Sequence, residues 1–125
     1  MIRYSETEPY DSGDVVCVAL VRIGQAVDWS PQTQEPELAV WVPEGTFERI
    51  GAIAQRLGFP VFYDLNIYEQ NRVSAAQCSA LLARWDEMEA ETLTTPAAPW
   101  AARIRELLRQ CASSVGRNEL LVEGP

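Results

Sequence analysis

The sequence predicts a small α/β or α+β domain, in which a mixed sheet of about three to four short strands packs against three to four helices. Two observations lead to this fold class: short β-branched apolar runs alternate with longer segments of helical periodicity, and proline or glycine marks many of the boundaries. With 125 residues, 47% of them hydrophobic, the chain can bury a core of its own. We therefore expect residues 1–125 to form a single domain, with residues 1–13 as an irregular acidic N-terminal segment.

Two apolar runs predict strands on either side of a helix. Residues 37–42 (ELAVWV) have the composition of a buried strand that Pro43 closes, and residues 60–65 (PVFYDL) have that of another. Apolar residues recur at helical spacing over residues 46–57, and Gly58 follows where a glycine commonly ends a helix. This spacing is typical of a βαβ unit or of its antiparallel equivalent, and both remain open.

The second half of the chain predicts two helices and a terminal strand. Residues 66–73 are polar and predict a loop, after which Ser74 caps a helix over residues 75–91. Residues 97–113 have the clearest helical period in the chain. The run ELLVE at residues 119–123 predicts a strand in the sheet.

The segment at residues 14–29 is compatible with two structures. Its many valines favour a buried strand. Its apolar side chains also share one broad arc at 100° per residue, with Ser12 at an N-cap position and Pro31 after the end. We expect a helix here and keep the strand as the alternative.

Charge is the most distinctive bulk property of the chain. Eighteen acidic residues face ten basic ones, for a net charge of −8, and every basic residue is arginine. The absence of histidine removes the usual general base and the commonest metal ligand. Negative charge disfavours nucleic-acid binding and attracts a basic protein partner. The alternative is that this charge serves solubility alone.

The cysteines, the glycines and the lengths of the apolar runs bear on disulfides, cofactors and cellular location. Cys17, Cys78 and Cys111 are odd in number and far apart, so we expect buried thiols rather than a disulfide framework. The glycines are scattered singly and form no phosphate-binding loop, and we expect no cofactor and no metal. No apolar run approaches the roughly 18 residues of a membrane span, and the N-terminus lacks the apolar core of a signal peptide. These features predict a cytoplasmic protein that does not bind membranes.

A polar cluster follows the predicted strand at residues 60–65. Asp64, Asn66, Tyr68 and Glu69 occupy this segment, at a strand end of the kind where α/β proteins bind ligands. The D-x-N start resembles a calcium loop, but Glu69 stands at the sixth position instead of glycine and Ala75 at the twelfth instead of glutamate. The cluster therefore predicts polar contacts to a partner, or side chains that satisfy the backbone of a turn.

A second acidic cluster lies toward the end of the helix predicted over residues 75–91. Asp86, Glu87, Glu89 and Glu91 crowd this end, where the helix dipole disfavours negative charge. We interpret the cluster as a docking patch for a basic partner, with a solvated helix face as the alternative.

The stretch from Pro36 to Trp85 has a distinctive order of features. It contains a short strand with Trp41, a helix that opens with Phe47, the Asp64-x-Asn66-x-Tyr68 loop and the helix capped by Ser74. In this order it resembles small bacterial immunity proteins that accompany secreted toxins. The resemblance implies an acidic α/β protein that binds and occludes a basic toxin domain, and it implies no particular site residues.

The leading hypothesis is a non-enzymatic binding protein of the immunity or antitoxin type, whose oligomeric state is open. One alternative is a self-associating regulatory or structural subunit, with the apolar strands and Trp29 at its interface. Another is a small carboxylate-dependent enzyme centred on Asp64 and Glu69. The predicted partner-binding residues are Asp64, Asn66, Tyr68, Glu69, Asp86, Glu87, Glu89 and Glu91.

Overall fold

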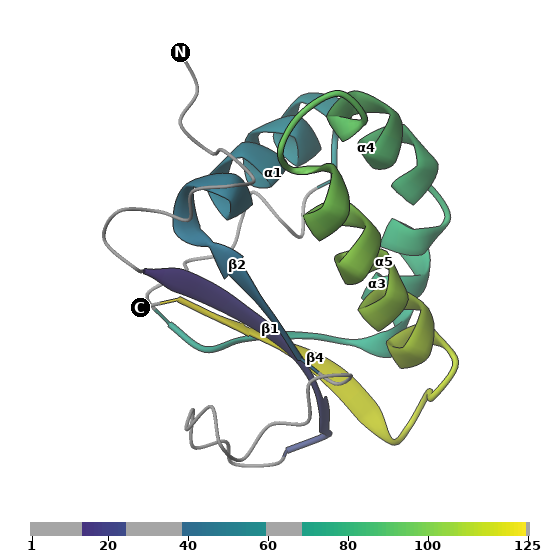
Figure 1. Cartoon of the computed structure of the whole chain (residues 1–125). Helices are drawn as coiled ribbons and strands as arrows, with labels where there is room; N and C mark the ends of the chain where they lie inside the picture. Colours follow the sequence, from purple (N-terminus) through teal and green to yellow (C-terminus); the bar gives the residue numbers. More distant parts are fainter. Residues whose placement is uncertain (1–13, 25–38, 60–68, 125) are drawn as a thin grey trace.

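The computed structural model of the chain describes residues 14–24, 39–59 and 69–124 (Figure 1). These residues form a four-stranded sheet with four helices on one of its faces, so the predicted fold class is confirmed. Every described strand pair is antiparallel, whereas we expected a mixed sheet. The strand order is β2-β1-β4-β3, with β1 at Val15–Arg22, β2 at Ala39–Pro43, β3 at Asn71–Val73 and β4 at Asn118–Glu123.

The expectation of a helix at residues 14–29 is wrong, because residues 15–22 form the central strand β1. Val16 and Val18 face the helices, and Cys17 and Ala19 are buried on the opposite face of the sheet. A strand that is buried on both faces is apolar at consecutive positions, and such a run also fills a broad arc of a helical wheel. Periodicity therefore could not separate the two structures, and valine content was the better guide.

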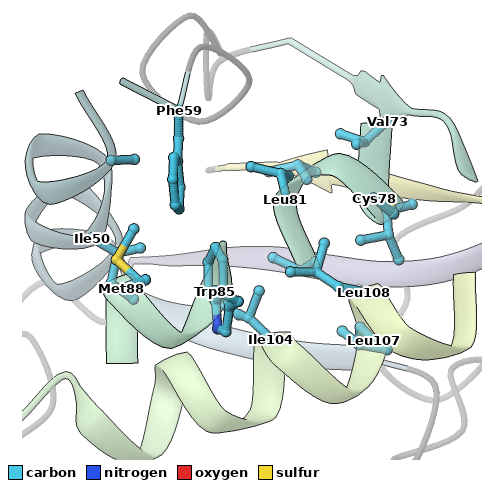
Figure 2. Packing of buried hydrophobic residues seen from close by; sticks show 14 of the residues in the cluster. Ile50, Phe59, Val73, Cys78, Leu81, Trp85, Met88, Ile104, Leu107 and Leu108 are labelled. Atoms are coloured by element: carbon cyan, nitrogen blue, oxygen red, sulfur yellow. The ribbon is translucent and has the colours of Figure 1, made fainter. Parts of the chain in front are cut away.

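The main core lies between the sheet and the helices. Figure 2 shows Trp85 at its centre, beside Met88, Ile104 and Leu108, and the ring of Phe59 stacks 6.2 Å from that of Trp85 between centroids. The indole Nε1 of Trp85 donates a 2.9 Å hydrogen bond to the carbonyl oxygen of Ala101, so this large buried side chain has its polar group satisfied. A smaller cluster occupies the other face of the sheet, and consists of Cys17, Ala19, Val21, Ala39 and Leu121, with Trp41 packed against it.

Helix α1, at Glu44–Leu57, confirms the helix predicted over residues 46–57. Gly58 ends it with a φ of 84°, a left-handed conformation that glycine adopts without strain. Its amide N–H donates to the carbonyl oxygen of Gln55, which satisfies one group of the last turn. The strand predicted over residues 60–65 lies outside the described residues.

The helix predicted over residues 75–91 is two helices, α3 at Ala75–Leu82 and α4 at Trp85–Thr92. The cap at Ser74 is confirmed, with reciprocal hydrogen bonds between Ser74 and Gln77. No glycine or proline marks the break at residues 83–84, so the local sequence gives no sign of it. The break accompanies the burial of Trp85 against α5, which is a tertiary contact.

The last two elements match the sequence closely. Helix α5, at Ala98–Ala112, confirms the helix predicted over residues 97–113, and β4 confirms the terminal strand. The loop predicted over residues 66–73 is wrong at its end, because Asn71–Val73 pairs with β4 as the short strand β3. None of the described helices has the length and apolarity to cross a membrane.

Candidate protein-binding site

The three cysteines are free and buried, as predicted. Desolvation by burial raises the pKa of the Cys17 thiol to about 12, with a further contribution from the charge of Glu123. Burial also raises the pKa of Cys78 and of Cys111. A thiol is a nucleophile only when ionised, so none of the three is prepared for catalysis at neutral pH.

The predicted polar cluster at residues 64–71 is only partly described. Asp64, Asn66 and Tyr68 lie outside the described residues, and the structure places only Glu69 of the four. Glu69 is exposed just before β3, and its carbonyl oxygen accepts a 3.0 Å hydrogen bond from Nδ2 of Asn71. Within residues 14–24, 39–59 and 69–124, no three histidine, cysteine or acidic side chains are grouped so that they could hold a metal ion.

The acidic side chains of α4 are each paired with an arginine from the same chain. Arg84 precedes α4, whereas Arg56 comes from α1 and Arg105 from α5. Hydrogen bonding from Arg84 lowers the pKa of the Glu87 carboxyl. The pairs are Arg84–Glu87 at 2.9 Å, Arg56–Glu91 at 2.5 Å, Arg105–Glu89 at 3.2 Å, and Arg105–Asp86.

The break before α4 also changes the electrostatics of Asp86 and Glu87. We expected both near the C-terminal end of a long helix, where negative charge is unfavourable. Because α4 begins at Trp85, both lie in its first turn, where the helix dipole favours negative charge. The expected electrostatic cost, which favoured a functional role for the cluster, is therefore absent at these two residues.

The net charge is distributed unevenly along the chain. The described residues contain eleven acidic residues and nine arginines, a difference of −2. The total is −8, so residues 1–13, 25–38 and 60–68 together carry −6 with seven acidic residues and one arginine. The acidity that distinguishes this sequence therefore belongs mainly to these three segments.

An apolar groove of about 570 Å³ lies between β2 and α5, and we call it the β2–α5 groove. Val40 points to the helix side of the sheet, whereas Ala39 and Trp41 point to the other side. Side chains from both faces of one strand can line a single groove only at the strand's edge. The groove is lined by Ala39, Val40, Trp41, Trp100, Arg103, Glu106, Leu107 and Gln110.

The hydrogen-bond register between β1 and β2 shows which backbone groups of β2 point away from β1, toward the side of β2 that no described strand covers. The amide of Glu44 donates to the carbonyl oxygen of Asp14 at 3.2 Å, so these two residues form a hydrogen-bonded antiparallel pair. Pairing alternates along an antiparallel ladder, so Val40 and Val42 also bond to β1, and Ala39 and Trp41 point their backbone groups away from it. No described strand pairs with that edge.

The wall of the groove on α5 contains a stacked aromatic and arginine pair. The guanidinium carbon of Arg103 lies 4.9 Å from the centroid of the Trp100 ring. Glu106, one turn away, is already bound by Arg109 and by Gln110, whose Nε2 donates to it at 3.1 Å. No described carboxylate forms an ion pair with Arg103, although acidic residues outnumber basic ones in the chain.

Sequence reasoning did not identify this groove. Trp100 belongs to the apolar period of the helix predicted over residues 97–113, and the structure shows that it is half-buried and contributes both to the core and to the groove. The spacing of Trp100 and Arg103 at i, i+3 was an available signal, because such side chains are neighbours on a helix surface. The role of β2 depends on the order of strands in the sheet, which the sequence did not reveal.

Comparison of the chain with protein-family models, with curated proteins and with solved structures finds no match. No family is therefore assigned to it. The resemblance of residues 36–85 to immunity proteins stays a prediction.

Proposed function

We propose that this protein is a non-enzymatic binding protein of the immunity or antitoxin type, which captures a basic protein partner. The observation that carries the proposal is the distribution of charge. Residues 1–13, 25–38 and 60–68 carry −6 of the net −8, whereas the acids of α4 are matched by arginines. A net charge of one sign accelerates encounter with a partner of opposite sign.

Two features of the ionisable groups argue against catalysis by the described residues. Burial suppresses ionisation of all three thiols. Arginine hydrogen bonds lower the carboxyl pKa of Glu87 and of Glu106, whereas a carboxyl that serves as a general acid needs a raised pKa. Glu87 and Glu106 therefore serve in ion pairs within the chain, and the enzyme alternative stays centred on Asp64 and Glu69.

The predicted contacts divide into two groups under this proposal. Asp64, Asn66 and Tyr68 lie in residues 60–68, one of the three segments that carry the surplus charge, and Glu69 follows directly in the sequence. Asp86, Glu87, Glu89 and Glu91 are exposed or half-buried, but a partner's cation would have to compete with Arg56, Arg84 or Arg105 for them. We expect the first group to contribute more to binding.

The test is a binding measurement against the proteins encoded by neighbouring genes, at low and at high salt. We expect one basic partner, whose association rate falls steeply as salt increases. Neutralising Asp28, Glu35 and Glu37 should slow association more than neutralising Asp86, Glu87 and Glu89, which is the matched control with three acids on α4. No basic partner, or binding that is insensitive to salt, would contradict the proposal.

A second candidate function is self-association, which is favoured by the edge of β2 that no described strand covers. Edge strands with unpaired backbone groups readily pair with another chain. Each copy carries a net charge of −8, which opposes the approach of two copies. Light scattering separates the candidates: a stable homodimer that binds no basic partner supports this second function.

A further inference from the structure

We propose that the β2–α5 groove binds an extended segment of a protein partner, which adds to the sheet beside β2 and carries an apolar side chain next to a carboxylate. The inference deepens the proposed function. It rests on that function in one respect, namely that the ligand is part of a protein. It assigns the contact surface to residues that the predicted acidic clusters do not include.

The first element of the site is the backbone of β2. Ala39 and Trp41 direct their N–H and C=O groups away from β1, and within the described residues no hydrogen bond engages them. An added strand would satisfy these groups and gain main-chain hydrogen bonds. Pro43 lacks an N–H at the next outward position, so the pairing has to end there. The site therefore fits a short strand.

The second element is apolar. Half-buried Trp100 and buried Leu107 line the groove from α5. Val40 lines it from the helix side of β2, and half-buried Trp41 lines it from the other side of the same edge. The volume of about 570 Å³ lies within the range of roughly 300–1,000 Å³ that is usual for ligand sites. Alternate side chains of an added strand point to the same face of the sheet, so one of them would enter between the strand and α5. Tryptophan is enriched among residues that anchor protein interfaces.

The third element is the charge of Arg103. Its guanidinium stacks on Trp100, another residue of the groove lining, and no described carboxylate pairs with it. Five other described arginines form ion pairs with carboxylates of the chain: Arg56, Arg72, Arg84, Arg105 and Arg109. A fixed guanidinium binds a carboxylate well, so charge complementarity selects a segment that carries one beside its apolar anchor.

A second copy of the chain is a poorer occupant than a partner segment. Pairing β2 with β2 of another copy would bring two chains of net charge −8 together. It would also place the Glu106 side chains of both copies in the shared groove, where each already has Arg109 and Gln110 as partners. Arg103, which has no carboxylate partner among the described residues, would gain none from Glu106.

The test uses a phage-displayed library of random heptapeptides, selected on the wild-type protein and counter-selected on Ala39→Pro. Proline at position 39 removes an outward N–H without removing a bond to β1, and circular dichroism checks that this variant keeps its fold. We expect enriched peptides with an apolar residue adjacent to aspartate or glutamate. Addition of such a peptide should shift the indole N–H resonances of Trp41 and Trp100 in NMR spectra.

A matched pair of arginine variants tests whether Arg103 binds the carboxylate of the peptide. Arg103 and Arg117 are both exposed and have no described carboxylate partner, but Arg117 lies in the loop before β4, outside the groove lining. Arg103→Gln should weaken binding of the enriched peptide about tenfold, and Arg117→Gln should leave it unchanged. Replacing the peptide's acidic residue by its amide should produce the same loss as Arg103→Gln.

Several results would overturn the inference. These are an absence of peptides enriched over Ala39→Pro, enrichment without acidic residues, equal effects of Arg103→Gln and Arg117→Gln, or a homodimer that Ala39→Pro dissociates. The outcome is separable from that of the proposed function. A basic partner whose binding survives Ala39→Pro would uphold the proposed function and reject the groove. Peptide binding at the groove without any basic partner would uphold the groove and reject the proposed function.

Discussion

Helix α4 and the β2–α5 groove use the same kinds of residues in opposite ways. On α4, each of the four acidic side chains is paired with an arginine of the same chain. In the groove, Arg103 stacks on Trp100 without a described carboxylate, and the backbone of Trp41 points away from its only described strand neighbour. The acidic cluster that is most conspicuous in the sequence is thus satisfied internally, and the less conspicuous surface retains binding capacity.

The comparison teaches that a cluster of charge indicates a binding surface only if the fold leaves it without partners. Arg56 and Arg105 reach α4 from other helices, at sequence separations of 35 and 19 residues. Their pairing lowers the capacity of α4 to bind a basic ligand, because any incoming cation has to displace an existing one. In the groove, no carboxylate of the described residues competes for Arg103.

The largest expected effect is the difference in stability loss between substitution of the buried Trp85 and substitution of Trp41 in the groove. Trp85 is fully buried and hydrogen-bonded, so Trp85→Ala should lower the free energy of unfolding by about 3–5 kcal/mol. Trp41 is only half-buried, and Trp41→Ala should cost less than half as much, roughly 1–2 kcal/mol. Urea unfolding followed by circular dichroism measures both. Equal losses would show that the groove side of β2 is part of the core.

A smaller effect distinguishes the paired arginine from the unpaired one. Arg105 binds Asp86 and Glu89 and is about one-third exposed, so Arg105→Gln should lower stability by about 1 kcal/mol. Arg103→Gln should change stability by no more than about 0.5 kcal/mol, as expected of an exposed side chain that no described carboxylate pairs with. If Arg103→Gln proves the more destabilising, its stacking on Trp100 is structural and the comparison fails.

The pH dependence of stability tests the ion pair between Arg84 and Glu87 of α4. The folded-state pKa of Glu87 lies below its ordinary value of 4.5, because Arg84 donates hydrogen bonds to the carboxylate. The stabilisation is therefore complete above pH 4.5 and is lost as the pH falls through the folded pKa. Urea midpoints at pH 7 and pH 3 should differ less in Arg84→Gln than in the wild type. Arg117→Gln serves as the control, and an unchanged difference in Arg84→Gln would contradict the ion pair.

The sequence predicted those elements whose signals are local. Helix α5 has an uninterrupted apolar period, α1 has Gly58 at its end, and Ser74 with Gln77 forms a capping box. Where the signal depends on tertiary structure, prediction failed. Because β1 is buried on both faces, its apolar pattern also fits a helix. The contact of Trp85 with α5 accompanies a helix break that no local residue marks.

The candidate site was less predictable than the fold for the same reason. The pairing of the α4 acids requires knowledge of which helices are neighbours, and the open edge of β2 requires the strand order. Burial of the thiols was predictable, because Cys78 and Cys111 fall on apolar helix faces. Of the predicted contact residues, Asp64, Asn66 and Tyr68 lie outside the described residues, so their role stays a prediction.

The most direct test of this comparison is the dissociation constant of the groove-selected heptapeptide for two variants, measured by isothermal titration calorimetry. Ala39→Pro changes the open edge of β2, and Asp86→Asn changes the most exposed acid of the α4 ion pairs. The account predicts a loss of at least about tenfold in affinity for Ala39→Pro and no change for Asp86→Asn. Unchanged affinity in Ala39→Pro, or a loss confined to Asp86→Asn, would contradict it.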